Sequence, residues 1–230
     1  MKYEAVIFDL DGTLIDTVKD LGAAVNHSLS LRGLPLHSIS EYTRMVGHGI
    51  RDLVTKALPE GRRTPEFVES ALRDFRDYYS SHIDVFSRPY EGIAELLKVL
   101  HDAGIYIAVA SNKFQEGTEA LIKSFFPDVR FVSILGNREG FPLKPDPAIT
   151  EEVLARILED RGTEASEGNI ASLKKRCVMV GDSGTDIKTA LNGGIHSIAV
   201  TWGFRPKEEL TDAEFIAITV NELKELLLAQ

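Results

Sequence analysis

The 230-residue chain has a single cysteine, Cys177, so no disulfide bond can form within it. Cys177 opens the short apolar run 177–180, where we expect a buried thiol in a reducing compartment. Nothing in the surrounding sequence forms an arrangement built to activate the thiol as a nucleophile. A disulfide-stapled scaffold is therefore excluded, and catalysis by a thiol has no support.

The sequence also lacks long hydrophobic runs and an excess of positive charge. No apolar run approaches the ~20 residues of a membrane-spanning helix, and Asp9 and Asp11 come too early for a signal peptide to form. The 26 basic and 35 acidic residues give a formal net charge of −9, whose field repels nucleic acids and anionic membranes. We expect a soluble, cytoplasmic protein that binds neither.

What the sequence does contain is an alternation of apolar runs and amphipathic helical patterns. The first run, 5–8, is wholly apolar and ends abruptly at Asp9, which is typical of a buried parallel strand. Similar runs recur at 106–110, 131–135, 177–180 and 195–200. Strands that alternate with helices predict an α/β fold with a doubly wound parallel sheet, that is, a Rossmann-like core. We interpret the polar interval 159–176 as a surface loop without a chemical role.

One interval breaks this alternation and predicts an inserted domain. About 70 residues separate Leu14 from the next core helix near Glu91, whereas connections in such sheets usually take only a few residues. Amphipathic helical patterns fill the interval. We therefore divide the chain into a Rossmann-like catalytic core, residues 1–14 and 86–230, and an inserted α-helical cap domain, residues 15–85.

Two pairs of carboxylates follow predicted strands. Asp9 and Asp11 stand at the end of the first strand, and Asp182 and Asp186, about one helical turn apart, follow the strand 177–180. Taken singly, such residues can be turn or helix-capping aspartates. Open α/β sheets bind ligands at these strand ends, and carboxylates gathered there would repel one another unless a cation or a shared proton relieved them. Oxygen ligands without Cys or His favour Mg²⁺ over zinc.

Two further segments are suited to phosphate. Ser111, Asn112 and Lys113 follow the strand 106–110 and offer a hydroxyl, an amide and backbone N–H groups. Lys144 lies in a stretch stiffened by two prolines, just ahead of a predicted helix. Alone, the tripeptide is a common helix start and the lysine a common surface residue. Beside the carboxylates, they indicate a phosphorylated ligand.

The four motifs fall in order after successive elements, and in this order they resemble the signature of the haloacid dehalogenase-like superfamily. The most specific part is residues 8–14, Phe-Asp-Leu-Asp-Gly-Thr-Leu, and the resemblance covers essentially the whole chain, cap included. Within the superfamily the chain most resembles the phosphoglycolate phosphatases. That narrower resemblance rests on short matches at Asp16-Thr17, 23–26, Gly47-His48-Gly49 and 180–183.

The resemblance implies a Mg²⁺-dependent phosphatase that hydrolyses a small phosphorylated metabolite through an aspartyl-phosphate. Asp9 would attack phosphorus, and Asp11 would protonate the leaving oxygen and then activate water. Ser111 and Asn112 would hold phosphate oxygens, and Lys144 would neutralise charge. The groups implied to hold or order Mg²⁺ are the Asp9 carboxylate, the Asp11 main-chain carbonyl, Asp182 and Asp186.

Related activities stay open. Asp11 favours phosphoryl transfer, because dehalogenases of this fold lack it and have no leaving alcohol to protonate. Sugar phosphomutases place a histidine in the first cap helix, where this chain has none at 19–22. A pyrophosphatase, a sugar phosphatase or phosphomutase, and, more remotely, a non-catalytic binding protein are the alternatives. His48 and Arg51 are candidates for substrate contact from the cap, or else for turn packing and a surface salt bridge. The sequence allows a monomer or a homodimer.

Overall fold

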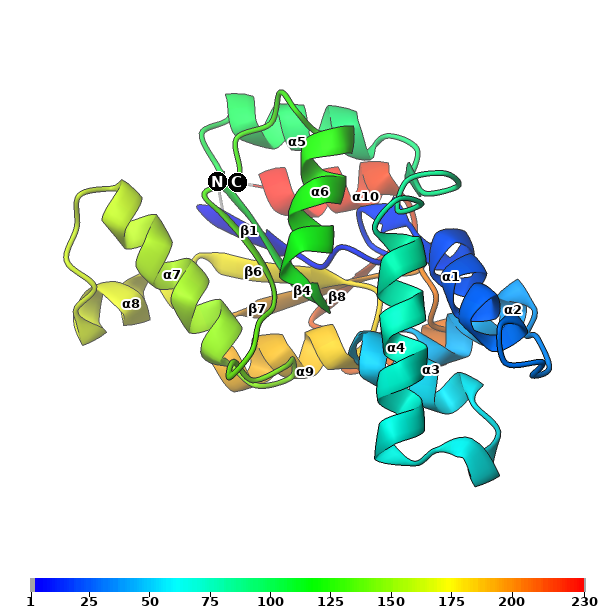
Figure 1. The fold of residues 1–230 in the computed structure, drawn as a ribbon. Coiled ribbons are helices and arrows are strands. Elements are labelled where there is room, and N and C mark those ends of the chain that lie inside the picture. Colours follow the sequence, from blue (N-terminus) through cyan, green and yellow to red (C-terminus); the bar gives the residue numbers. More distant parts are fainter. Residues whose placement is uncertain (1–2, 230) are drawn as a thin grey trace.

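A six-stranded parallel sheet forms the centre of the protein, whose computed structural model describes residues 3–229 (Figure 1). The strand order is β5-β4-β1-β6-β7-β8, and each neighbouring pair runs parallel. The strands are β1 (Ala5–Phe8), β4 (Tyr106–Phe114), β5 (Ser133–Asn137), β6 (Cys177–Gly181), β7 (His196–Val200) and β8 (Phe215–Ala217). The prediction of a doubly wound parallel sheet is confirmed.

Helices cover both faces of this sheet (Figure 1). One face carries α5 (Ile93–Asp102), α6 (Gln115–Phe125) and α10 (Val220–Leu228), and the other carries α7 (Ala148–Asp160), α8 (Glu167–Lys174) and α9 (Gly184–Gly193). In the wholly buried β1, Val6 and Phe8 pack with the first group of helices, whereas Ala5 and Ile7 pack with the second. Successive side chains of a strand point to opposite faces, so an uninterrupted apolar run requires helices on both sides.

The inserted segment between β1 and α5 forms a separate helical layer with its own apolar core. Its helices are α1 (Val18–Ser30), α2 (Ile39–Met45), α3 (Gly49–Ala57) and α4 (Pro65–Tyr79), with a short 3-10 turn, η1 (Glu60–Arg62). The chain enters and leaves through β2 (Ile15–Asp16) and β3 (Arg88–Pro89), which pair antiparallel. A second 3-10 turn, η2 (Lys207–Leu210), follows β7 in the core. We keep the name cap for residues 15–85.

The interval 159–176 is where the prediction from sequence is wrong. It contains α8 rather than a loop only, and this helix begins after Ser166, whose hydroxyl accepts a hydrogen bond from the backbone N–H of Asn169. Leu173 is the one buried residue of α8, so the helix has no apolar stripe for a pattern to detect. The helix α2, with Tyr42 as its one buried residue, was not predicted for the same reason.

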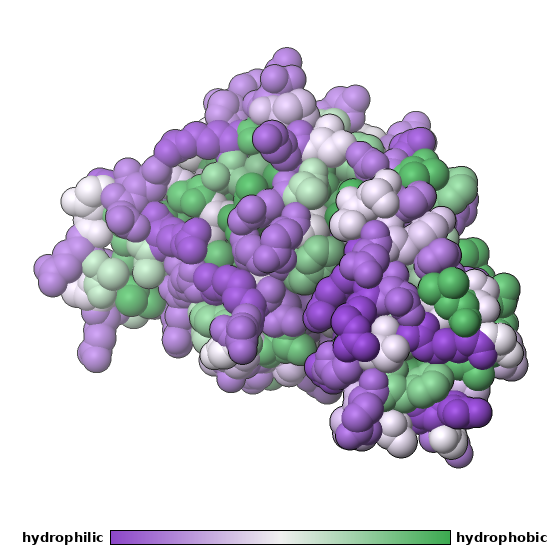
Figure 2. Space-filling view, viewed as in Figure 1, coloured by the Kyte–Doolittle hydropathy of each residue, from purple (hydrophilic) through white to green (hydrophobic). Residues whose placement is uncertain are grey.

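The surface is hydrophilic over much of the face shown in Figure 2, and apolar atoms gather over the outer side of the cap. Leu31, Leu36 and Ile39, in α2 and in the loop before it, are exposed. Among the helices of the described part of the chain, none is both long and apolar enough to cross a membrane.

Asp20 ties the first cap helix to the second connection between cap and core. The side chain is 1% exposed. Its Oδ2 accepts hydrogen bonds from the backbone N–H and the hydroxyl of Ser87, each at 2.7 Å, and the backbone N–H of Phe86 lies 3.0 Å from both carboxylate oxygens. A buried carboxylate that is satisfied by three donors fixes the position of the chain beside it.

We expect Asp20→Ala to lower the free energy of unfolding by about 3 kcal/mol, because the buried backbone N–H of Ser87 and the partly buried one of Phe86 lose their acceptor. Urea denaturation followed by circular dichroism measures the change. The neighbouring exposed Lys19→Ala is the matched control and should stay within about 0.5 kcal/mol of wild type. Equal stability of the two variants would contradict a structural role for Asp20.

Candidate active site

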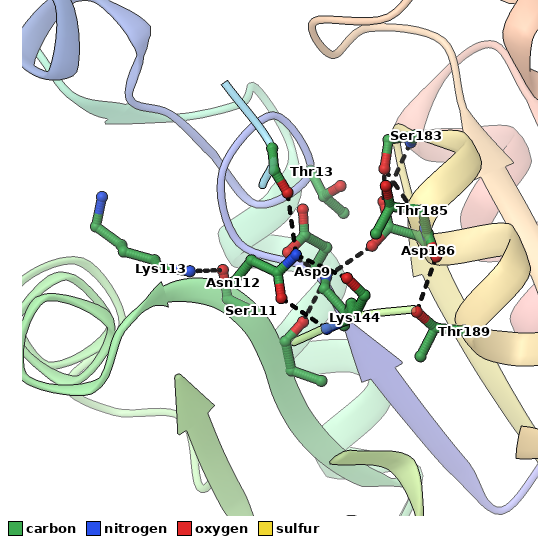
Figure 3. A network of polar contacts seen from close by, with 12 residues as sticks. Asp9, Thr13, Ser111, Asn112, Lys113, Lys144, Ser183, Thr185, Asp186 and Thr189 are labelled. Carbon is green, nitrogen blue, oxygen red and sulfur yellow. Dashed lines mark hydrogen bonds and ion pairs between the residues drawn. The ribbon is translucent and has the colours of Figure 1, made fainter. Parts of the chain in front are cut away.

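Four segments place polar side chains together at the carboxyl edge of the sheet (Figure 3). Asp9 follows β1, Ser111 lies near the end of β4, Lys144 comes from the loop between β5 and α7, and Asp182 follows β6. All four line one cavity between the sheet edge and the cap. Parallel strands end at the same edge, which explains why residues so distant in sequence meet there.

Lys144 lies at the centre of the site. Its Nζ donates to Asp9 Oδ1 at 2.7 Å, to Asp186 Oδ1 at 2.7 Å and to the carbonyl oxygen of Ala110 at 2.8 Å. All three ammonium donors are thus in use, and the side chain is 2% exposed. Burial opposes the charge, but the carboxylates of Asp186 and Asp9 outweigh it and raise the pKa of Lys144 above its usual value. The alternative of a solvated surface lysine does not fit this environment.

Asn112 fixes the loop that carries Lys144. Its Oδ1 accepts a hydrogen bond from the backbone N–H of Lys144 at 2.8 Å, and its Nδ2 donates to the carbonyl oxygens of Lys144 and of Gly47 in the cap. In this arrangement the Asn112 amide is occupied by the protein itself. It therefore links three segments of the site, namely β4, the Lys144 loop and the cap.

Residues 111–113 interrupt the regular pairing of β4 with β5. Gly136 of β5 lies against this irregularity, and a Cβ there would come within 2.6 Å of the Lys113 carbonyl oxygen. Only glycine lets the two segments approach so closely.

Ser111 is buried and lines the cavity beside Asn112 and Lys113. Its Oγ accepts a hydrogen bond from the backbone N–H of Lys113 at 3.2 Å.

Asp182 is held between the first motif and the loop after β7. Its Oδ2 accepts a 2.6 Å hydrogen bond from the backbone N–H of Phe204, and the Thr13 hydroxyl lies 3.4 Å from Oδ1. The turn at Gly12 passes directly over this carboxylate with φ +91°, and a Cβ on Gly12 would lie 2.5 Å from Asp182 Oδ2. Glycine is required there for both the backbone conformation and the space.

Asp186 uses both carboxylate oxygens within the protein. Oδ1 accepts the hydrogen bond from Lys144, and Oδ2 accepts from the backbone N–H of Ser183 at 3.1 Å and from its hydroxyl at 2.6 Å. The Ser183 hydroxyl also accepts from the backbone N–H of Asp186, so the pair forms a capping box at the start of α9. In this structure Asp186 therefore positions Lys144 and the first turn of α9.

Asp11 is held by residues at the base of the cap and lines the same cavity as Asp9. Its Oδ1 accepts a 2.6 Å hydrogen bond from the Thr17 hydroxyl, and the Lys113 Nζ lies 3.3 Å away. Lys113 also donates to the Tyr79 hydroxyl of α4 at 2.7 Å. From the sequence, the backbone N–H groups of 111–113 and the side chains of Ser111 and Asn112 are expected to bind phosphate, with no role for the Lys113 side chain. A lysine directly after Ser111 and Asn112 at a strand end is the signal that could have identified Lys113.

The acidic cluster fits a hard divalent cation. Asp9, Asp182 and Asp186 each offer an oxygen within 4.8 Å of the others, and all three are buried. Burial raises the pKa of Asp9 to about 7 despite the opposing effect of Lys144, and the Asp186 charge adds to the rise. Burial, with Asp186 and Asp9, also raises the pKa of Asp182 well above its usual value. Buried carboxylates that resist ionisation in one another's presence are relieved by a cation, and their oxygen donors suit Mg²⁺.

The cap closes the cavity with apolar side chains. The space open to the centres of water-sized molecules is about 40 Å³. Leu21, Ile50 and Leu53 of the cap line it. The structure does not bring His48 and Arg51 there, because they line a separate groove toward the loop 137–143. Arg51 is exposed and forms an ion pair with Glu69, whereas the cations that line the cavity are Lys113, Lys144 and Arg205.

Arg205 joins the core to the cap. It belongs to the loop after β7, and its guanidinium donates to the carbonyl oxygens of Arg44, at 3.1 Å, and Val46, at 2.5 Å, with the Thr43 carbonyl oxygen at 3.5 Å. These carbonyls form the end of α2 and lack partners within the helix, so a cation there is favourable. The adjacent Phe204 binds Asp182, so one short segment contacts both the acidic cluster and the cap. Nothing in the sequence pattern of this loop indicates that role.

Comparison with known proteins gives a consistent result. Residues 6–200 match the haloacid dehalogenase-like hydrolase family. The phosphoglycolate phosphatase of Mesorhizobium japonicum is 34% identical over 236 residues, which cover 99% of this chain and 98% of that protein. The N-acetylmuramic acid 6-phosphate phosphatase of Pseudomonas aeruginosa is 31% identical, with 91% of this chain and 86% of that protein covered.

The fold has close counterparts among solved structures. The crystal structure of a candidate phosphoglycolate phosphatase from Lactobacillus delbrueckii superposes with a TM-score of 0.87 and 32% sequence identity, and the match covers 100% of both chains. The arrangement of sheet and cap is therefore shared along the whole length of the two proteins.

The raised pKa values of the acidic cluster predict how stability changes with pH. Asp9 has a pKa of about 7 in the folded protein against 3.8 ordinarily, so between these values the folded state binds more protons than the unfolded state. In EDTA, the free energy of unfolding should therefore fall by roughly 2 kcal/mol or more from about pH 5 to about pH 8 through this site. Asp182, whose pKa shift has the same sign, adds to the fall.

Mg²⁺ competes with these protons, so it should raise the melting temperature more at about pH 8 than at about pH 5. Differential scanning calorimetry with EDTA or Mg²⁺ measures both effects. Asp182→Asn removes one titrating carboxylate and should reduce both the pH dependence and the response to Mg²⁺. An equal Mg²⁺ response at the two pH values would contradict the assignment of the cation to this cluster.

Proposed function

Because the chain belongs to the haloacid dehalogenase-like hydrolase family, we propose that it hydrolyses a small phosphorylated metabolite in a Mg²⁺-dependent reaction through an aspartyl-phosphate. The match to phosphatases over nearly the whole chain supports a phosphoric monoester hydrolase. The name of the relative with 34% identity suggests phosphoglycolate as the substrate.

The observation that carries the mechanism is the ammonium of Lys144 held 2.7 Å from Asp9. Burial alone would keep Asp9 protonated and unreactive, whereas the adjacent ammonium favours its ionised, nucleophilic form. The same ammonium lies where a phosphoryl group on Asp9 would place its charge. Lys144 can therefore support the nucleophile before attack and the phosphoryl group after it.

The reaction has two steps. First, an oxygen of Asp9 bonds to phosphorus as the bond from phosphorus to the leaving oxygen breaks, and Asp11 gives its proton to that oxygen, so an alcohol leaves. Then ionised Asp11 takes a proton from water, the water oxygen bonds to phosphorus, and the bond from Asp9 to phosphorus breaks to release inorganic phosphate. Ser111, buried beside Asp9, would donate its hydroxyl to a phosphate oxygen.

Mg²⁺ would be held by the carboxylates of Asp9 and Asp182 and by the main-chain carbonyl of Asp11. None of the hydrogen bonds found within residues 3–229 ends on that carbonyl, which leaves it available as a ligand. When bound, the ion would supply positive charge that balances the carboxylates and the phosphate oxygens. Asp186 would act indirectly, by orienting Lys144 and Ser183.

We expect Mg²⁺-dependent release of phosphate from phosphoglycolate, with less from sugar phosphates, pyrophosphate and nucleotides. Asp9→Asn keeps the shape of the side chain but removes the nucleophile, so kcat should fall by ~10³-fold or more. Steady-state phosphate release, with EDTA in parallel, measures both effects.

The exposed Asp128→Asn is the matched control for Asp9→Asn and should retain wild-type activity. Turnover that persists in EDTA, or full activity of Asp9→Asn, is incompatible with the proposed mechanism. A preference for pyrophosphate or a sugar phosphate would instead preserve the mechanism and change the substrate.

A further inference from the structure

The part of the cavity that would enclose the leaving group has an unusual composition. The cap residues that line it are Leu21, Val46, Gly47, Gly49, Ile50 and Leu53. None of these, within the described chain, has a side chain that can form a hydrogen bond. A leaving group with several hydroxyls would lose its hydrogen bonds to water there without replacement, at a cost of roughly 1–3 kcal/mol for each group. The wall therefore favours a short leaving group with few hydroxyls.

Three cations line the same cavity, and two are committed elsewhere. Lys144 spends its three donors on Asp9, Asp186 and a carbonyl. Arg205 directs both terminal nitrogens of its guanidinium to main-chain carbonyls of the cap. Lys113 differs, because its described partners are the Tyr79 hydroxyl, at 2.7 Å, and the Asp11 carboxylate, at the longer distance of 3.3 Å.

The Lys113 ammonium is nearly free of water, since the side chain is 1% exposed. A buried cation is costly unless an anion and further hydrogen bonds satisfy it, and one long contact to Asp11 does this only in part. The ring of Tyr79, 4.7 Å from the Nζ, and its hydroxyl hold the ammonium in place from the cap side. Lys113 is therefore a preorganised cation with capacity for a further acceptor at the wall of the cavity.

The position of Lys113 follows from that of Asp11. To protonate the leaving oxygen, Asp11 must lie within hydrogen-bonding reach of it. Lys113 contacts the same Asp11 oxygen that Thr17 binds, so it lies beside the leaving oxygen. In the phosphate ester of a 2-hydroxy acid, the carboxylate is attached to the carbon that bears this oxygen. A short leaving group can place such a carboxylate against Lys113.

We infer that Lys113 binds the carboxylate of the leaving group and thereby selects phosphate esters of short 2-hydroxy acids. The inference rests on the proposed phosphatase reaction and assigns the group that determines its specificity. Tyr79 positions Lys113, and the apolar cap residues exclude polyols.

A matched pair of substrates tests this role. Phosphoglycolate and its carboxamide, phosphoglycolamide, have nearly the same shape and differ in the charge that Lys113 would bind. For wild type with Mg²⁺, we expect kcat/KM to favour phosphoglycolate by at least ~30-fold, the lower end of the range for a buried charge pair. In Lys113→Met this preference should fall below ~5-fold, mainly through a higher KM for phosphoglycolate.

Two further variants provide a backup for Lys113→Met and a control at another cation of the cavity. Tyr79→Phe keeps the shape of the core but removes the hydroxyl that holds the Lys113 Nζ, so it should reduce the preference for phosphoglycolate over the amide by ~3-fold to ~10-fold. This variant tests the inference if Lys113→Met fails to fold. Arg205→Met loosens the contact between core and cap and should lower kcat/KM for both substrates by similar factors. Loss of the preference in Arg205→Met, with retention in Lys113→Met, would assign the carboxylate to Arg205 instead.

The remaining outcomes separate the inference from the proposed function. A wild-type enzyme that hydrolyses the two esters equally well, or a Lys113→Met variant that loses both activities by the same factor, overturns the role of Lys113 and preserves the phosphatase. Absence of Mg²⁺-dependent hydrolysis of either ester in wild type overturns the proposed function itself.

Discussion

The site depends on one buried arrangement of charge, the Lys144 ammonium between the carboxylates of Asp9 and Asp186. Burying any one of these three charged groups alone would cost free energy. Together the cost is offset, because every ammonium donor has an acceptor. The surrounding structure maintains this contact. Asn112 fixes the backbone of Lys144, and Ser183 fixes Asp186 at the first turn of α9. The order of strands in the sheet places Asp9 between the segments that carry them.

The second constraint is the contact between cap and core. Asn112 and Arg205 both donate to carbonyl oxygens in the cap, one to Gly47 and the other to the end of α2. Lys113 reaches the Tyr79 hydroxyl in α4. Asn112 and Lys113 contact residues of the reaction centre, and Arg205 follows Phe204, whose backbone binds Asp182, so the position of the cap and the geometry of the site are physically connected. Closure of the cap would exclude water from the phosphoryl group and complete the wall around the leaving group.

The sequence predicted five of the six strands of the sheet, because short apolar runs that hand over to polar or glycine-containing sequence are strong and local signals, whereas the three-residue β8 was not predicted. Asp9, Ser111 and Asp182 could be named because each stands at the end of such a run. Lys144 could be named because two prolines and a predicted helix follow it. The helix α8 was missed, because a helix that buries only Leu173 carries no periodic pattern. The sequence also does not predict the directions in which side chains point. That Lys113 lines the cavity while Arg51 binds Glu69 at the surface depends on an interrupted strand and on how α3 packs.

The central claim is that Asp9 carries the phosphoryl group during turnover. The most direct measurement is an acid quench of the enzyme during hydrolysis of phosphoglycolate with Mg²⁺, followed by mass spectrometry of its peptides. We predict one phosphoryl group on the peptide that contains Asp9, sensitive to hydroxylamine as an acyl phosphate is, and none in Asp9→Asn. Continued turnover without a phosphorylated peptide, or phosphate on another residue, would contradict the claim.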